Sequence, residues 1–180
     1  MNYLSPLEMF YKWESLNPNE IYLSQPIDNV WHNWTWKDYG LEVRKMASYL
    51  KSLNLPQNSK IALLSKNCAH WLMADMAIMM SGHVSVPIYP NLNSETLEKI
   101  LTHSESKLLF VGKLDNFSSM KKGVPLNIDC ITFPFYSENF PRWDELIKDV
   151  EPIADHIIRD SSDLATIIYT SGTTGDPKGV

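Results

Sequence analysis

The chain has 180 residues, of which 44% are hydrophobic and 21% are charged, a composition ordinary for one globular domain with a substantial core. Sixteen basic residues against 21 acidic residues give a net charge of −5. This balance disfavours a general nucleic-acid binder, because neutralising phosphates requires clustered lysine and arginine. Cys68 and Cys130 lack the spacing of a zinc site or a disulfide framework, so we expect a reduced, cytoplasmic setting.

The N-terminal ten residues do not combine a basic segment with a long apolar stretch, so the sequence predicts no signal peptide. The most apolar segment, residues 69–80, is interrupted by His70 and Asp75 and is too short to span a bilayer. We therefore do not expect an integral membrane protein.

The sequence begins with a predicted helix over residues 4–16, which has Pro6 in its first turn. Two strands follow, over residues 21–24 and 30–34, joined by a turn over residues 25–29. These segments together predict a β-hairpin near the N-terminus.

A second helix is predicted to begin at Thr35, which forms a capping-box pattern with Asp38. Apolar residues then recur every three or four positions as far as Leu53, which indicates one buried helix face. The apolar residues of that face are Tyr39, Val43, Met46, Leu50 and Leu53.

From Lys60 onward the pattern alternates between short apolar strands and helices. The predicted strands are residues 61–64, 84–89, 107–111, 129–133 and 164–169. The predicted helices are residues 68–80, a segment capped by Ser94, and residues 143–150. This alternation predicts an α/β fold with a mostly parallel sheet and helices on both faces, in which residues 113–134 are less regular.

The last twelve residues form a loop rich in Gly, Ser and Thr with one lysine. Glycines allow positive φ and close approach to a ligand, and hydroxyls and backbone N–H groups donate hydrogen bonds to phosphate oxygens. Lys178 adds a positive charge. The Walker A pattern fails, because Pro177 has no N–H and Gly179 has no hydroxyl for magnesium.

The order Y-T-S-G-T-T-G-D-P-K-G-V over residues 169–180 resembles the signature of the adenylate-forming superfamily. This resemblance implies a loop that holds the β- and γ-phosphates of ATP while a carboxylate attacks the α-phosphate. Residues 22–26, Trp31, 35–38 and 82–90 resemble the long-chain fatty acyl-CoA synthetase branch. The implied phosphate-binding residues are Thr170, Ser171, Gly172, Thr173, Thr174, Gly175 and Lys178.

The resemblance implies a parent enzyme that uses ATP, magnesium, a fatty acid and coenzyme A, and that can associate peripherally with a membrane. Residues 1–180 are expected to form an incomplete N-terminal adenylation domain ending at the phosphate loop, with no catalytic residue and no metal ligand of its own. We expect this polypeptide to be inactive alone, to hold its terminal loop loosely, and to self-associate through exposed apolar surface. The alternatives are a non-catalytic α/β interaction module with residual anion binding and a phosphohydrolase with a new type of phosphate loop.

Several other residue types have both a functional and a structural interpretation, of which the structural one is preferred. Trp31, Trp34 and Trp36 fit core packing or cross-strand pairing better than a stacking surface. His70 is interpreted as a hydrogen-bonded structural residue, and Asp75 as a residue with a structural partner. The five histidines have no spacing suited to a metal or a catalytic triad.

Overall fold

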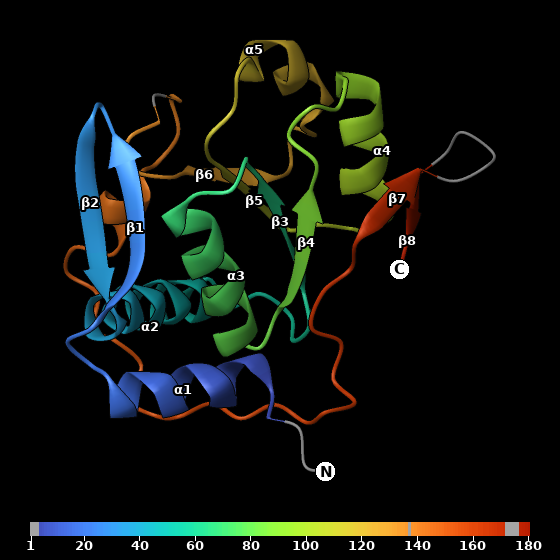
Figure 1. The fold of residues 1–180 in the computed structure, drawn as a ribbon. Coiled ribbons are helices and arrows are strands. Elements are labelled where there is room, and N and C mark those ends of the chain that lie inside the picture. Colours follow the sequence, from blue (N-terminus) through green and yellow to red (C-terminus); the bar gives the residue numbers. More distant parts are fainter. Residues whose placement is uncertain (1–3, 137, 172–176) are drawn as a thin grey trace.

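The computed structural model describes residues 4–136, 138–171 and 177–180 (Figure 1). Its centre is a four-stranded sheet in the order β4-β3-β5-β6, with every neighbouring pair parallel. The strands are β3 (Lys60–Leu64), β4 (Val84–Ile88), β5 (Leu108–Val111) and β6 (Asp129–Thr132). The predicted α/β class with a parallel sheet is confirmed.

Side chains along each strand alternate between two hydrophobic clusters, one on each face of the sheet. In β3, Ile61 and Leu63 belong to the first cluster, whereas Ala62 and Leu64 belong to the second. The same alternation separates Phe110 from its neighbours in β5. Continuous apolar strands are therefore explained by burial on both faces.

Helices cover both faces, as predicted. The first cluster includes residues of α1 (Pro6–Leu16), α2 (Trp36–Ser52) and α3 (Ala69–Met80). The second cluster includes residues of α4 (Ser94–His103) and α5 (Phe117–Met120), the latter followed by the 3-10 turn η1 (Lys121–Gly123). The connection after β3 runs through α3 on the first face, whereas the connection after its neighbour β5 runs through α5 on the second face, which makes the carboxyl ends of β3 and β5 a topological switch point.

The N-terminal hairpin consists of β1 (Ile21–Ile27) and β2 (Val30–Thr35) and is longer than predicted. The predicted turn over residues 25–29 is wrong, because Pro26 lies inside β1 opposite Trp31. Proline is tolerated on an edge strand, where its missing N–H costs no ladder bond. Only Asp28 and Asn29 form the turn, with φ of 49° and 63°, the left-handed geometry that Asp and Asn accept more readily than other residues.

Side chains cap the starts of α2 and α4. The Thr35 hydroxyl accepts the N–H of Asp38, and the Asp38 carboxylate accepts the N–H of Thr35, so the predicted capping box is confirmed. The predicted cap Ser94 is wrong by one residue. Asn93 is extended and its Oδ1 accepts the N–H of Thr96 at 2.8 Å, which satisfies a donor that α4 leaves free.

The segment after residue 140 differs most from expectation. Helix α6 (Trp143–Leu146) is shorter than predicted, and the strand expected over 164–169 is wrong. Residues 164–168 contribute only one parallel bridge, between Thr166 and Ser85 of β4. Ser85 donates its N–H to Ala165, and the next residue of β4 with the same orientation is Pro87, which has no N–H. Pairing therefore stops after one bridge.

The chain ends in a two-stranded antiparallel hairpin, β7 (Tyr169–Ser171) and β8 (Pro177–Gly179). In Figure 1 this red hairpin stands beside α4, at the β4 edge of the sheet. Within the described part of the chain, no helix combines the length and apolar character needed to cross a membrane.

Candidate functional site

The hairpin β7–β8 presents two of the predicted phosphate-binding residues side by side. Thr170 is the cross-strand partner of Lys178, and both side chains are exposed. Directly opposed residues of an antiparallel pair project from the same face. A hydroxyl donor and an ammonium group therefore share one solvent-facing surface of the hairpin. The backbone of Ser171 pairs with Pro177.

The remaining predicted residues, Gly172, Thr173, Thr174 and Gly175, lie outside the residues that the structure describes. The expectation of a loosely held terminal loop falls largely on the same segment. Its flanks are paired, since Ile168 and Val180 exchange two backbone hydrogen bonds of 2.9 Å each. Val180 therefore continues the hairpin ladder beyond Lys178.

Tyr169, the first residue of β7, anchors the hairpin to α4. Its side chain is only 4% exposed and belongs to the second hydrophobic cluster. Its hydroxyl lies 2.7 Å from Nδ1 of His103, and the two rings meet edge-on at 88° with centroids 5.7 Å apart. Burial raises the pKa of Tyr169, so the phenol keeps its proton at neutral pH. Sequence reasoning missed His103 because no periodicity or spacing links residues 66 positions apart.

Gly179 has a role other than the positive φ expected of the loop glycines. Gly82 is the one described glycine with positive φ, so Gly179 does not use that freedom. A Cβ at Gly179 would lie 2.9 Å from Cγ2 of Ile167 and 3.3 Å from the Tyr169 ring. The absence of a side chain therefore lets β8 pack against Tyr169.

A cavity of about 250 Å³ lies next to the start of the hairpin, at the carboxyl ends of β3 and β4. Open α/β sheets bind their ligands outside the carboxyl ends of their strands. Its lining combines aliphatic and aromatic side chains with the polar groups of Ser65, Asn67 and Tyr89. The lining residues are Ser65, Asn67, Trp71, Pro87, Ile88, Tyr89, Pro90 and Ile168.

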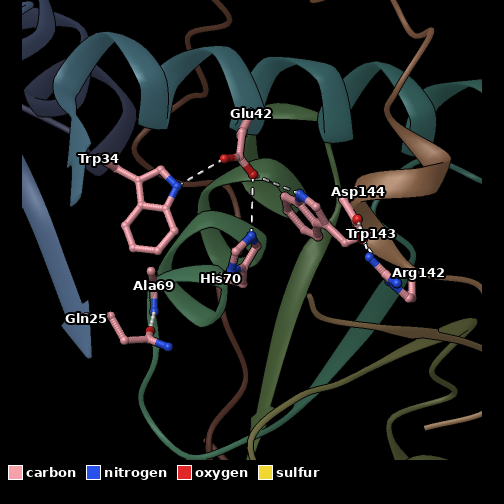
Figure 2. A network of polar contacts seen from close by, with 8 residues as sticks. All are labelled: Gln25, Trp34, Glu42, Ala69, His70, Arg142, Trp143 and Asp144. Carbon is pink, nitrogen blue, oxygen red and sulfur yellow. Dashed lines mark hydrogen bonds and ion pairs between the residues drawn. The ribbon is translucent and has the colours of Figure 1, made fainter. Parts of the chain in front are cut away.

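A carboxylate on α2 joins the hairpin β1–β2 to the helices on the first face of the sheet (Figure 2). Glu42 accepts hydrogen bonds from the indole N–H groups of Trp34 at 3.1 Å and Trp143 at 3.2 Å. Nε2 of His70 lies 3.4 Å from the same carboxylate, and the His70 side chain is buried. His70 and Trp34 therefore both lie against Glu42 in the packed face of the sheet.

Asp75 and the other two tryptophans also have structural surroundings. Burial raises the pKa of the Asp75 carboxyl, and the Ser85 side chain acts in the opposite direction. Trp36 begins α2 and stacks on Tyr22 with ring centroids 3.7 Å apart. Trp31 is 65% exposed and sits opposite Pro26 in the hairpin, so it pairs across the strands but does not enter the core.

The part of the chain that the structure describes contains no cluster of three metal-binding side chains. Among residues 4–136, 138–171 and 177–180, no three His, Cys, Asp or Glu side chains converge on one point. Magnesium prefers several oxygen ligands at short distance.

A family model described as "AMP-binding enzyme" matches residues 10–180, and the chain belongs to this family of adenylate-forming enzymes. The chain is 32% identical to long chain acyl-CoA synthetase 4 of Arabidopsis thaliana, over 92% of this chain and 27% of that protein. It is 31% identical to a long-chain-fatty-acid–CoA ligase of Mycobacterium bovis, over 95% of this chain and 30% of that protein. The chain thus spans less than a third of the length of these curated relatives.

Solved structures show the same fold at lower identity. An anthranilate CoA ligase in complex with anthranoyl-AMP superposes with a TM-score of 0.78 at 21% identity, covering 99% of this chain and 34% of that one. A benzoate CoA ligase of Burkholderia xenovorans gives 0.76 at 18% identity, covering 96% and 33%. The expected N-terminal adenylating fold is confirmed.

Proposed function

We propose that the protein carrying this chain is an ATP-dependent long-chain fatty acid–CoA ligase, and that residues 1–180 supply part of its adenylation domain. The observation that carries the proposal is the pairing of Thr170 with Lys178 on a hairpin beside the carboxyl end of a parallel sheet. Family membership over residues 10–180 and long-chain relatives at about 30% identity support the choice of reaction and substrate.

In this reaction the fatty-acid carboxylate attacks the α-phosphorus of ATP, and the bond to pyrophosphate breaks. Negative charge builds on the departing pyrophosphate, so donors and cations placed beside it lower the barrier. Lys178 has the right charge, and Thr170 adds a hydroxyl on the same face. The thiol of coenzyme A then attacks the acyl carbonyl and displaces AMP.

We assign the phosphate contacts to the loop and its two flanks. Thr173, Thr174 and Lys178 carry most of the side-chain contacts, while Ser171 and the glycines shape the loop. The full set is Thr170, Ser171, Gly172, Thr173, Thr174, Gly175 and Lys178. We further propose that residues 1–180 alone do not turn over, because these contacts grip ATP without supplying a group that acts on the carboxylate or the thiol.

The test expresses the complete coding sequence and measures acyl-CoA formation by mass spectrometry with ATP, magnesium and coenzyme A. Hexadecanoate is compared with benzoate and anthranilate. We expect hexadecanoyl-CoA to form and the aromatic acids to be poor substrates. Thioester formation from benzoate alone would contradict the long-chain assignment. A folded protein that activates no carboxylate would favour a non-catalytic module. Turnover by residues 1–180 would contradict their proposed inactivity.

A further inference from the structure

We propose that His103 positions the phosphate-binding hairpin by holding the hydroxyl of Tyr169, an inference that rests on the proposed function. His103 is the last residue of α4, and its Nδ1 lies 2.7 Å from the Tyr169 hydroxyl. In this proposal α4, which precedes the loop by almost 70 residues, fixes the position of the hairpin that carries the loop.

Helix α4 is a rigid base because its apolar residues are fixed in the second hydrophobic cluster. Leu97, Ile100 and Leu101 are each no more than 3% exposed and pack with strand residues such as Val86. The helix begins at a capped end, where Asn93 accepts the N–H of Thr96. Its C-terminal residue therefore has a defined position relative to the sheet.

The hairpin has few other attachments to the sheet. One isolated bridge, between Thr166 and Ser85, joins the preceding segment to β4, and Pro87 ends that ladder. Beyond it, Tyr169 is the one described residue of β7 and β8 that is buried. Its ring lies between Gly179 of β8 and the end of α4.

The orientation of Tyr169 decides which way the phosphate-binding side chains face. Neighbouring residues of a strand point to opposite faces, so an inward Tyr169 directs Thr170 outward. Lys178 is opposite Thr170 and faces the same way. A slip of one residue would reverse all three, as it does for any strand with one buried face. The hydrogen bond to His103 adds a directional constraint that apolar burial alone does not provide.

His103 is exposed, although its Nδ1 contacts Tyr169. It can therefore be replaced with little disturbance of the packed interior. His103→Ala removes the hydrogen bond without opening the core. His103→Asn keeps a polar atom at the same distance along the side chain. Thr102→Ala, an exposed neighbour on the same helix, is the matched control.

The kinetic experiment uses the complete enzyme and follows fatty-acid-dependent exchange of pyrophosphate into ATP. We expect His103→Ala and Tyr169→Phe each to raise KM for ATP about three- to tenfold, with KM for the fatty acid and the unfolding midpoint unchanged. His103→Asn should keep KM for ATP close to the wild-type value. The His103→Ala/Tyr169→Phe double variant should raise KM for ATP no more than the poorer single variant does.

A second measurement follows amide hydrogen exchange in the complete enzyme. The amides of Ile168 and Val180 should exchange several-fold faster in His103→Ala, while those of β3 keep their rates. The positioning role would be overturned if His103→Ala showed the same amide exchange rates and the same ATP kinetics as the wild type. A wild-type enzyme that exchanges no pyrophosphate would instead overturn the proposed function, and the positioning role with it.

Discussion

Gln25, near the end of β1, closes the N-terminus of a helix that begins 44 residues later. Its Oε1 accepts the backbone N–H of Ala69, the first residue of α3, at 2.7 Å (Figure 2). Cys68, the residue in the capping position, makes no side-chain cap bond. Gln25 also donates through Nε2 to the hydroxyl of Tyr136 at 3.1 Å. The hairpin thus supplies the cap that the local sequence lacks.

Removing this cap is expected to destabilise the fold. Gln25→Ala leaves the N–H of Ala69 without its acceptor, and the free energy of unfolding should fall by about 1–2 kcal/mol. Gln57→Ala, an exposed loop position, is the control and should change it by less than about 0.5 kcal/mol. Urea denaturation measures both. Equal stabilities of the two variants would show that Gln25 is not a cap in solution.

The Glu42 carboxylate is expected to contribute more than a surface charge does. Glu42→Ala deprives the indole N–H groups of Trp34 and Trp143 of their acceptor, which should cost about 2 kcal/mol or more in unfolding free energy. The exposed Glu98 of α4 provides the comparison. Near-identical unfolding curves for Glu42→Ala and Glu98→Ala would refute this role, and the tryptophan fluorescence of the folded state should shift only in the former.

The two-residue turn of the N-terminal hairpin allows a stabilising change. Asn29 has φ of 63°, so Asn29→Gly relieves residual strain and should raise the unfolding free energy by a few tenths to about 1 kcal/mol. Asn29→Val places a β-branched residue in the same conformation and should lower it by about 1–2 kcal/mol. Thermal unfolding that ranks Val above Gly would contradict the described turn.

Asp75 predicts a specific dependence of stability on pH. Burial raises the pKa of this carboxyl above its ordinary 3.8 in the folded state. The folded state therefore favours the protonated carboxyl, and this adds to the free energy of unfolding at low pH. The added stability is lost as pH rises through the raised pKa. Asp75→Asn does not titrate, so it should unfold about 2–4 °C higher than the wild type at pH 8 and show a smaller difference at pH 4.

The exposed Asp149→Asn variant is the control for that experiment. Its difference from the wild type should be small at both pH values. An Asp75→Asn variant whose advantage grows toward low pH would have the opposite sign to the one that burial requires.

Local signals were sufficient wherever neighbours in sequence make the decisive contact. The Thr35–Asp38 capping box and the apolar run of β3 both depend on residues within a few positions of each other, and both were predicted. The turn over residues 25–29 was predicted because proline is common in turns. Pro26 is instead tolerated within β1 because this strand lies at the edge of its sheet, which the sequence does not show.

Long-range contacts at the site were beyond such reasoning. The motif identified Thr170 and Lys178 as members of one loop, and the hairpin register then placed them opposite each other. The end of the last strand depends on Pro87 in another strand, and the anchor of Tyr169 depends on His103 in another helix. Neither partner carries a signal in its own sequence neighbourhood.

The most direct test of the account compares Lys178→Ala with Lys122→Ala, an exposed lysine of η1, in the complete enzyme. Hexadecanoate-dependent exchange of labelled pyrophosphate into ATP is measured for both. We expect kcat/KM for ATP to fall at least about tenfold in Lys178→Ala and to stay near the wild-type value in Lys122→Ala. Equal exchange by the two variants would contradict the phosphate-binding role of the hairpin.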